Sequence, residues 1–213
     1  MTRLYVVCEG LTEVNFVTEL LKPHLEAPDP SLLTVGAPNL KGNYTYAQLK
    51  KFVKNLLGSP ASLVAVTTMV DLFKIPGDYP GIAYASNEAP IERAHRLEHH
   101  CRGDIDDLRF FPYLQLHEFE ALLLTDLTVL VNQHPNRRRE ISELAARLER
   151  EFASPEHVDR LRPPSYWIRD AVPEYSKTID GSITASGIGF PKLRERCPHF
   201  GQWLQRLEDL AGA

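Results

Sequence analysis

The first 25 residues constrain the fold most, because they predict a buried strand that runs through an acidic turn straight into a helix. Residues 4–8 form an apolar run rich in β-formers, and Glu9 and Gly10 end it. Thr12 is expected to cap the helix that follows, and Pro23 to bend or end it. Apolar residues recur in this segment at helical spacing: Val14, Phe16, Val17, Leu20, Leu21 and Leu25.

The same order, strand then helix, repeats over the next hundred residues. Further strands are predicted at 32–35, 63–70 and 108–116, with an irregularity expected at Pro112 in the last of them. Helices are predicted over 46–57, closed by Gly58, and over 90–100. This alternation predicts an α/β fold with a mostly parallel sheet of about four strands and helices on its faces.

The pattern changes at about residue 126, after which no strand is predicted. Helical stretches are expected at 140–152, 155–162, 190–196 and 200–211, and prolines at 163, 164 and 173 interrupt them. We therefore expect two parts: an α/β core over residues 1–125, and a helical extension over residues 126–213 that packs on the core.

Charge and cysteine content narrow the function classes. The net charge of −4 argues against a basic surface over the whole protein, although it leaves room for a local basic strip. The three cysteines, Cys8, Cys101 and Cys197, lie far apart without a CxxC pair, which disfavours a zinc knuckle and fits a reducing compartment. No signal peptide or membrane-spanning apolar run is visible, so the expected location is the cytoplasm.

Carboxylates follow three of the predicted strands. Glu9 and Glu13 follow the first strand, Asp71 follows the third, and Glu118 and Glu120 follow the fourth. The carboxyl ends of parallel strands open on one edge of the sheet, where such folds bind ligands, so these side chains are expected to converge. Hard oxygen ligands of this kind suit Mg²⁺ or Mn²⁺, which can activate water for phosphoryl chemistry.

Each of these residues also has a simpler interpretation. Glu13 can favour the helix dipole, Asp71 can cap the loop after its strand, and Glu118 can cap a helix and leave Glu120 on a solvated face. His117 is a metal ligand or general base, or else a structural histidine. Three separate clusters at matching strand ends nevertheless favour a shared site.

Well-known phosphate-binding and nucleophile motifs are missing. The sequence contains no GxxxxGK[ST] loop, no GxGxxG and no GxSxG. The turn-rich segment 77–81 is either a lid over the site or a plain connection.

The residues around the first turn resemble a known signature. Val7-Cys8-Glu9-Gly10-Leu11-Thr12-Glu13 resembles the VEGxTE motif that opens the Toprim domain of topoisomerases, primases and overcoming-lysogenization-defect nucleases. In that family an Asp-x-Asp pair follows the third strand. Here the corresponding residues are Asp71-Leu72-Phe73, so Phe73 replaces the second aspartate.

Four other segments resemble one subgroup more closely. Residues 69–73, 116–123, 175–177 and 197–200 are similar to a bacterial domain-of-unknown-function family of Toprim-like proteins. Such proteins are often encoded beside ATPases of the ABC/SMC type in anti-phage defence loci. The resemblance extends over nearly the whole chain.

This resemblance implies a set of metal ligands. Glu9 and Asp71 would bind Mg²⁺ or Mn²⁺. The resemblance does not assign Glu118 and Glu120, and we infer separately that they supply the carboxylates lost at Phe73.

It also implies an activity. The expected function is a metal-dependent nuclease that cleaves DNA or RNA as the effector of an ATPase partner, with Glu13 supplementing the ligands. Lys177 is expected to contact phosphate, or else to be an ordinary surface lysine. The alternative is a non-catalytic Toprim-like subunit that binds or regulates the ATPase complex, which Phe73 and the acidic charge favour. A different phosphoryl-transfer enzyme that uses nucleotides is a third possibility, which the missing phosphate loop disfavours.

Overall fold

A parallel sheet organises the first half of the chain. The protein is described here by a computed structural model that covers residues 2–29, 31–58, 62–84, 88–158 and 162–212. The strand order is β2-β1-β3-β4, and β5 pairs with the end of β3. The strands are β1 (Thr2–Cys8), β2 (Leu33–Gly36), β3 (Leu63–Asp71), β4 (Phe110–Phe111) and β5 (Leu114–Gln115).

All pairings in the sheet are parallel, as the sequence predicts. The expected irregularity at Pro112 is real, since the predicted strand 108–116 is split into β4 and β5 on either side of it. Proline cannot donate a ladder hydrogen bond, which explains the break. The α/β class, a parallel sheet of four to five strands flanked by helices, is confirmed.

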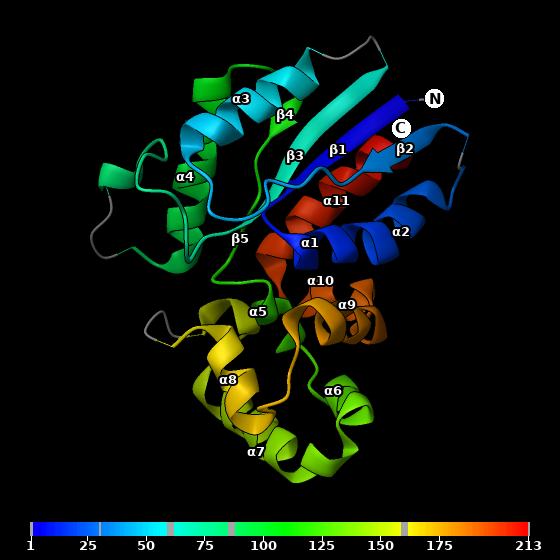
Figure 1. Ribbon diagram of the computed structural model, residues 1–213, viewed down its shortest axis with the longest axis vertical. Coiled ribbons are helices and arrows are strands. Elements are labelled where there is room, and N and C mark those ends of the chain that lie inside the picture. The colour runs from blue at the N-terminus through cyan, green and yellow to red at the C-terminus, as the bar shows by residue number, and fades with distance from the viewer. Residues whose placement is uncertain (1, 30, 59–61, 85–87, 159–161, 213) are drawn as a thin grey trace.

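Helices of the first half cover both faces of the sheet (Figure 1). One apolar cluster joins β1 and β3 to α3 and α4, and another joins the opposite face to α1, α2 and α11. The bounds are α1 (Leu11–Phe16), a π-helical turn (Val17–Leu21), α2 (Lys22–Glu26), α3 (Tyr46–Leu57) and α4 (Pro90–Ile105). The predicted helix over 90–100 is therefore five residues longer than expected.

One expectation for the first helix is wrong: the cap residue is Gly10 and not Thr12, which lies buried in the first turn. Pro23 was expected to bend or end the helix, and it does not end it, since the helical path continues to Glu26. The turn before the proline is a π-helix, and this wider turn accommodates a residue without a backbone N–H.

Helices alone follow β5 in the described part of the chain, and three of them were not predicted: α6, α8 and α9. The predicted helix over 155–162 is wrong at its start, where only a 3-10 turn (Pro155–His157) forms; residues 159–161 lie outside the described residues. The helices are α5 (Glu120–Leu123), α6 (Thr128–Gln133), α7 (Arg138–Glu151), α8 (Pro164–Ala171), α9 (Lys177–Ile188), α10 (Phe190–Arg196) and α11 (Pro198–Gly212).

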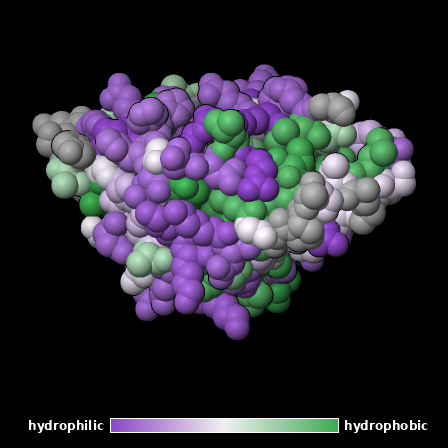
Figure 2. All heavy atoms as spheres, turned by 90° about the horizontal axis from the view of Figure 1, so that it is seen from above, coloured by the Kyte–Doolittle hydropathy of each residue, from purple (hydrophilic) through white to green (hydrophobic). Residues whose placement is uncertain are grey.

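The arrangement places the carboxyl ends of the strands in the middle of the molecule, above α5 and α9 (Figure 1). Figure 2 shows the opposite end, where the strands begin; hydrophilic side chains and one hydrophobic area share this face. Among the described residues, no helix is long and apolar enough to cross a membrane. The division into parts at residue 125 stays a prediction.

Phe16 connects α1 to the later helices. Its ring makes edge-on contacts with Phe119, Phe190 and Phe200 at centroid distances of 5.5, 6.2 and 6.1 Å. These contacts join the N-terminal strand–helix unit to segments more than 100 residues away. One apolar cluster accordingly includes residues from both halves of the chain.

We expect Phe16→Ala to lower the free energy of unfolding by about 3–5 kcal/mol, because it removes a fully buried ring and leaves a cavity. Urea denaturation followed by far-UV circular dichroism and tryptophan fluorescence measures this loss, and both signals should report one transition. Leu108→Ala is the control, since Leu108 is 90% exposed. A loss below about 1 kcal/mol would contradict the assigned role.

Candidate active site

Two carboxylates lie side by side at the carboxyl ends of the central strands. Glu9 comes directly after β1, and Asp71 is the last residue of β3. The parallel register aligns Cys8 with Met69, so β3 extends two residues beyond the end of β1 and Asp71 lies close to Glu9. The backbone N–H of Asp71 donates to Glu9 Oε2 at 3.0 Å, which holds the Glu9 side chain over the end of the neighbouring strand.

Glu13 points back to the same strand end from the first turn of α1. Its Oε2 accepts a hydrogen bond from the Gly10 N–H at 2.9 Å, as in the reciprocal half of a capping box. The side chain therefore has a local role at the helix start, as the simpler interpretation suggested. Its other oxygen, Oε1, is buried and faces the cluster described next.

Lys177, the first residue of α9, brings three carboxylates together. Its Nζ lies 3.2 Å from Glu120 Oε2, 3.5 Å from Asp71 Oδ2 and 3.8 Å from Glu13 Oε1. We define the acidic cluster as Glu9, Glu13, Asp71 and Glu120; the last three contact the ammonium, and Glu9 joins them through its hydrogen bond with the Asp71 N–H. The predicted convergence of carboxylates from separate strand ends is present for these four residues.

Close packing of α9 against α1 and α5 makes this contact possible. A Cβ atom at Gly181 would lie 3.3 Å from the Phe119 ring and 3.5 Å from the Thr12 methyl group. A larger side chain there would push α9, and Lys177 with it, away from the strand ends. Glycine is therefore the residue that best fits this contact.

Burial dominates the electrostatics of the cluster. It raises the pKa of Asp71 well above its usual value, helped by Glu13, Glu9 and Glu120 and opposed by Lys177. Burial likewise raises the pKa values of Glu9 and Glu120. Burial lowers the pKa of Lys177, but Asp71, Glu120 and Glu13 outweigh it and hold this pKa above its usual value. The ammonium stays charged and partly compensates the carboxylates.

Several carboxylate oxygens of the acidic cluster accept no hydrogen bond from the described residues. Asp71 Oδ1, Glu13 Oε1 and Glu120 Oε1 are buried without a hydrogen-bond partner in the described part of the chain. Buried carboxylate oxygens are costly unless they are paired or coordinate a metal. This donor set is all oxygen and anionic, so it fits Mg²⁺ or Mn²⁺.

Glu118 and Glu120 have different surroundings. Glu118 Oε2 accepts a hydrogen bond from the Ser165 N–H at 3.1 Å, so Glu118 caps α8 rather than a helix of its own segment. Glu120 is 0% exposed, so the interpretation that it lies on a solvated face is wrong. All four residues of α5, Glu120 to Leu123, are buried. Only Glu120 of the two contacts Lys177.

A pocket of about 570 Å³ opens beside the acidic cluster. Glu120, a member of the cluster, and Lys177, which contacts it, both line the pocket, so the pocket leads to the carboxylates. Phe73 and Tyr166 line it with side chains that are 46% and 59% exposed. Its lining residues are Phe73, Lys74, Glu118, Glu120, Arg162, Pro163, Ser165, Tyr166, Arg169 and Lys177. The pocket lining thus combines the carboxylates of Glu118 and Glu120 with four basic side chains and two exposed aromatic rings.

Sequence reasoning missed most of this pocket. Tyr166 and Arg169 lie on α8, a helix that was not predicted, although its apolar residues recur with a helical period. Lys74 was visible as a basic residue three positions after Asp71 but was not singled out.

For His117 and for the segment 77–81, the contacts favour the structural interpretation over the functional one. The Nε2 of His117 lies 3.1 Å from the Glu156 carbonyl oxygen, and the ring is buried. Asp78 accepts hydrogen bonds from the backbone N–H groups of Tyr46 and Ala47 at 2.9 and 3.3 Å. The segment 77–81 is therefore attached to the start of α3, as expected of a connection.

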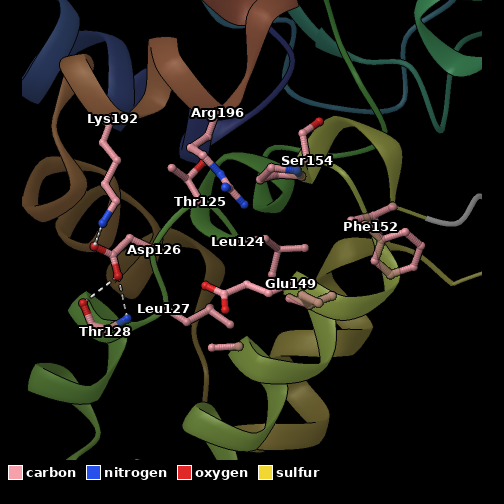
Figure 3. A pocket seen from close by; sticks show the side chains of 14 residues that line it. Leu124, Thr125, Asp126, Leu127, Thr128, Glu149, Phe152, Ser154, Lys192 and Arg196 are labelled. Atoms are coloured by element: carbon pink, nitrogen blue, oxygen red, sulfur yellow. Dashed lines mark hydrogen bonds and ion pairs between the residues drawn. The ribbon is translucent and has the colours of Figure 1, made fainter.

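Two other features lie apart from this chemistry. The three cysteines are free and buried, and burial raises the pKa of Cys101 to about 11 and that of Cys197 to about 12, which makes these thiols unreactive at neutral pH. A second pocket of about 240 Å³ lies between α7 and α10 (Figure 3). There Lys192 pairs with Asp126 at 2.5 Å, and no member of the acidic cluster lines it.

Comparison with known proteins gives one family and one group of structures. The sequence profile of the family described as domain of unknown function (DUF4276) matches residues 8–208. The iodine-phased C-terminal region of the Xanthomonas campestris pv. campestris OLD protein is 16% identical, with a TM-score of 0.49 over 100% of this chain and 97% of that chain. The platinum-phased structure of the same region is 15% identical, with a TM-score of 0.47 over 96% and 94%. No curated protein matches the chain.

We expect Lys177→Met to lower the free energy of unfolding by about 1–3 kcal/mol, less than for a fully buried pair because Lys177 is 30% exposed. The variant leaves buried carboxylates without their cation. Adding Glu120→Gln to it should recover part of the loss, because the uncompensated charge falls.

Denaturation in metal-free buffer measures both variants. Lys192→Met is the matched control, since its ion pair with Asp126 is exposed. Equal losses for Lys177→Met and Lys192→Met would contradict a central role for the Lys177 ammonium.

Proposed function

The chain belongs to the DUF4276 family, and we propose that it is a Toprim-like nuclease that cleaves phosphodiester bonds of DNA or RNA with Mg²⁺ or Mn²⁺. The observation that carries this proposal is the acidic cluster, in which oxygens from three carboxylates lie within 3.8 Å of the Lys177 ammonium. A cation already lies among these groups, and some of their buried oxygens have no other partner in the described part of the chain.

Glu9, Asp71 and Glu120 would hold the ion, and Glu118 would complete or tune the site from the pocket wall. Once bound, the ion supplies an activated water and stabilises charge on the phosphoryl oxygens. The chain's own groups fix the geometry: the Asp71 N–H orients Glu9, and the Gly10 N–H orients Glu13. Backbone hydrogen bonds of this kind hold the carboxylate oxygens in the orientation that a metal ion would need.

Lys177 would act on the substrate as well as on the carboxylates. Its side chain lines the pocket while its Nζ contacts the cluster. A fixed positive charge at this position can bind a phosphate oxygen and stabilise the charge that develops there during cleavage. Lys177 is thereby proposed to be the phosphate contact that the sequence suggested.

The pocket suggests how a nucleic acid strand approaches. Lys74 and Arg169 are exposed basic residues beside the carboxylates, where they can neutralise backbone phosphates. Phe73 and Tyr166 are exposed aromatic residues at the same pocket, and bases of single strands stack on such side chains. We therefore extend the proposal to single-stranded segments as the preferred substrate. The net charge of −4 agrees with a local rather than a general basic surface.

The remaining parts of the proposal concern the cell. We propose that the protein works in the cytoplasm as the effector of an ABC/SMC-type ATPase encoded nearby, in defence against phage. The reduced, buried cysteines agree with that compartment. Co-purification with the ATPase encoded by a neighbouring gene tests the partnership directly.

A second candidate is a non-catalytic module that binds nucleic acid or regulates the ATPase. Phe73 favours it, because this side chain stands where the second aspartate of the related Asp-x-Asp is expected, and Lys177 already compensates part of the charge. Isothermal titration with Mn²⁺ separates the candidates. Binding that is lost in Asp71→Asn supports the nuclease, and no binding at millimolar Mn²⁺ supports the module.

We expect Glu9→Gln and Asp71→Asn each to lower Mg²⁺- or Mn²⁺-dependent cleavage by about 100-fold or more, because metal contacts stabilise transition-state charge by several kcal/mol. Cleavage of plasmid, single-stranded DNA and RNA is measured by gel. Glu143→Gln is the matched control, since Glu143 is an exposed carboxylate on α7. Cleavage by Asp71→Asn at the rate of the unmodified protein would sink the assignment.

We expect Phe73→Ala and Tyr166→Ala each to weaken binding of a single-stranded oligonucleotide by about 5- to 150-fold, since stacking on an aromatic ring contributes about 1–3 kcal/mol per base. Fluorescence anisotropy in EDTA measures binding without cleavage. Binding of a blunt duplex should change less, because its bases are already stacked. Leu108→Ala is the control, and unchanged single-strand affinity in both aromatic variants would remove the stacking role.

A further inference from the structure

A second group of candidate metal ligands lies where α4, β5 and α11 meet. His95 and Glu98 come from successive turns of α4, and His199 comes from the first turn of α11. One ligand atom from each of the three residues lies within 4.8 Å of the others. Among the described residues, the hydrogen-bond partners of these three side chains are one another and Leu114, and none belongs to the acidic cluster. This group is therefore separate from that cluster.

The two imidazole rings face one another through ring nitrogens. His199 Nδ1 lies 3.2 Å from His95 Nε2. Two nitrogens that bind one tetrahedral Zn²⁺ at about 2.0–2.1 Å are separated by about 3.3–3.4 Å. The observed separation is therefore close to that of a ligand pair.

The other nitrogen of His199 has the partners that a metal-binding histidine needs. His199 Nε2 lies 3.0 Å from Glu98 Oε1 and 3.1 Å from the Leu114 carbonyl oxygen. Both partners accept hydrogen bonds, so this nitrogen carries the proton and donates. In the neutral ring, Nδ1 is then left with its lone pair directed toward His95. Metal-binding histidines are typically oriented in this way by a carboxylate or carbonyl behind the ring.

Packing fixes His199 and leaves an approach from solvent. The His199 ring is 4% exposed and stacks on Tyr113 at a centroid distance of 5.1 Å. Glu98 is held as well, because its Oε1 accepts the Leu114 N–H at 2.7 Å. His95 is exposed on α4. An ion can therefore reach a fixed histidine through a ligand that lies at the surface.

We propose that His95 and His199 bind a second metal ion, Zn²⁺ or a similar borderline ion such as Co²⁺ or Ni²⁺, and that Glu98 orients the His199 ring from behind. Imidazole nitrogen suits these ions, whereas the all-oxygen acidic cluster suits Mg²⁺ or Mn²⁺. Water would complete the coordination on the exposed side. Because its ligands come from α4 and α11, a bound ion would hold the C-terminal helix against the sheet and raise stability. The proposal does not depend on nuclease activity.

A plain hydrogen bond between the two rings is the competing explanation, and metal titration of the full-length protein separates the two. We expect Co²⁺ to produce visible absorption bands in the unmodified protein and Zn²⁺ to displace it. Zn²⁺ should also raise the melting temperature. In His95→Ala the Co²⁺ affinity should fall at least tenfold; this residue is exposed, so the variant should fold.

His99→Ala is the matched control, because His99 is an exposed histidine on the same helix outside the ligand group. Asp71→Asn should keep the Co²⁺ bands, which makes this test independent of the acidic cluster. No bands in the unmodified protein, or equal Co²⁺ affinity in His95→Ala and His99→Ala, would overturn the proposal.

Discussion

The ammonium of Lys177 between Glu13, Asp71 and Glu120 is the contact on which the rest of the arrangement depends. It lies at distances of 3.2–3.8 Å from groups that belong to α1, β3 and α5. Each of these elements reaches the centre of the molecule from a different part of the chain (Figure 1). Burying several carboxylates at one point is unfavourable unless a cation compensates them. The helix that carries the cation must therefore pack against the strand ends, and Gly181 lets it do so.

The raised pKa values show that this compensation is incomplete. Asp71, Glu9 and Glu120 bind protons more tightly in the folded protein than in the unfolded chain. Their ionisation at neutral pH therefore costs folding free energy, and the cost grows as the pH rises above the values of the unfolded chain. If these carboxylates had no function, replacing one of them with an uncharged side chain would stabilise the protein. Retaining all three is easier to explain if a divalent ion supplies the missing positive charge.

The strands and three parts of the cluster could be predicted because they follow from local pattern. Glu9, Asp71 and Glu120 each come just after an apolar β-rich run, and parallel strands bring such positions together. Lys177 was named only from a resemblance. Its helix contains two glycines and five β-branched residues in KTIDGSITASGI, a composition of low helix propensity, so packing on α1 rather than local preference forms it. Residue type alone predicts Thr12 as the cap. The Glu13 carboxylate instead accepts the Gly10 N–H, and the helix begins earlier in the chain, at Leu11.

Phe73 gives the site a different charge balance from that of an Asp-x-Asp pair. Its side chain is 46% exposed at the pocket and contributes no oxygen to the cluster. The carboxylate partner of Asp71 instead comes from Glu120, which the turn after β5 places on the same ammonium. Phe73 offers no carboxylate two residues after Asp71, and Glu120, nearly 50 residues away, places one on the Lys177 ammonium instead. In exchange, the pocket gains an aromatic surface directly beside the carboxylates, where a flexible strand can stack a base and a rigid duplex cannot. The acidic cluster supports the proposed nuclease, whereas Phe73 favours the proposed binding module, and the affinity of the cluster for Mn²⁺ decides between them.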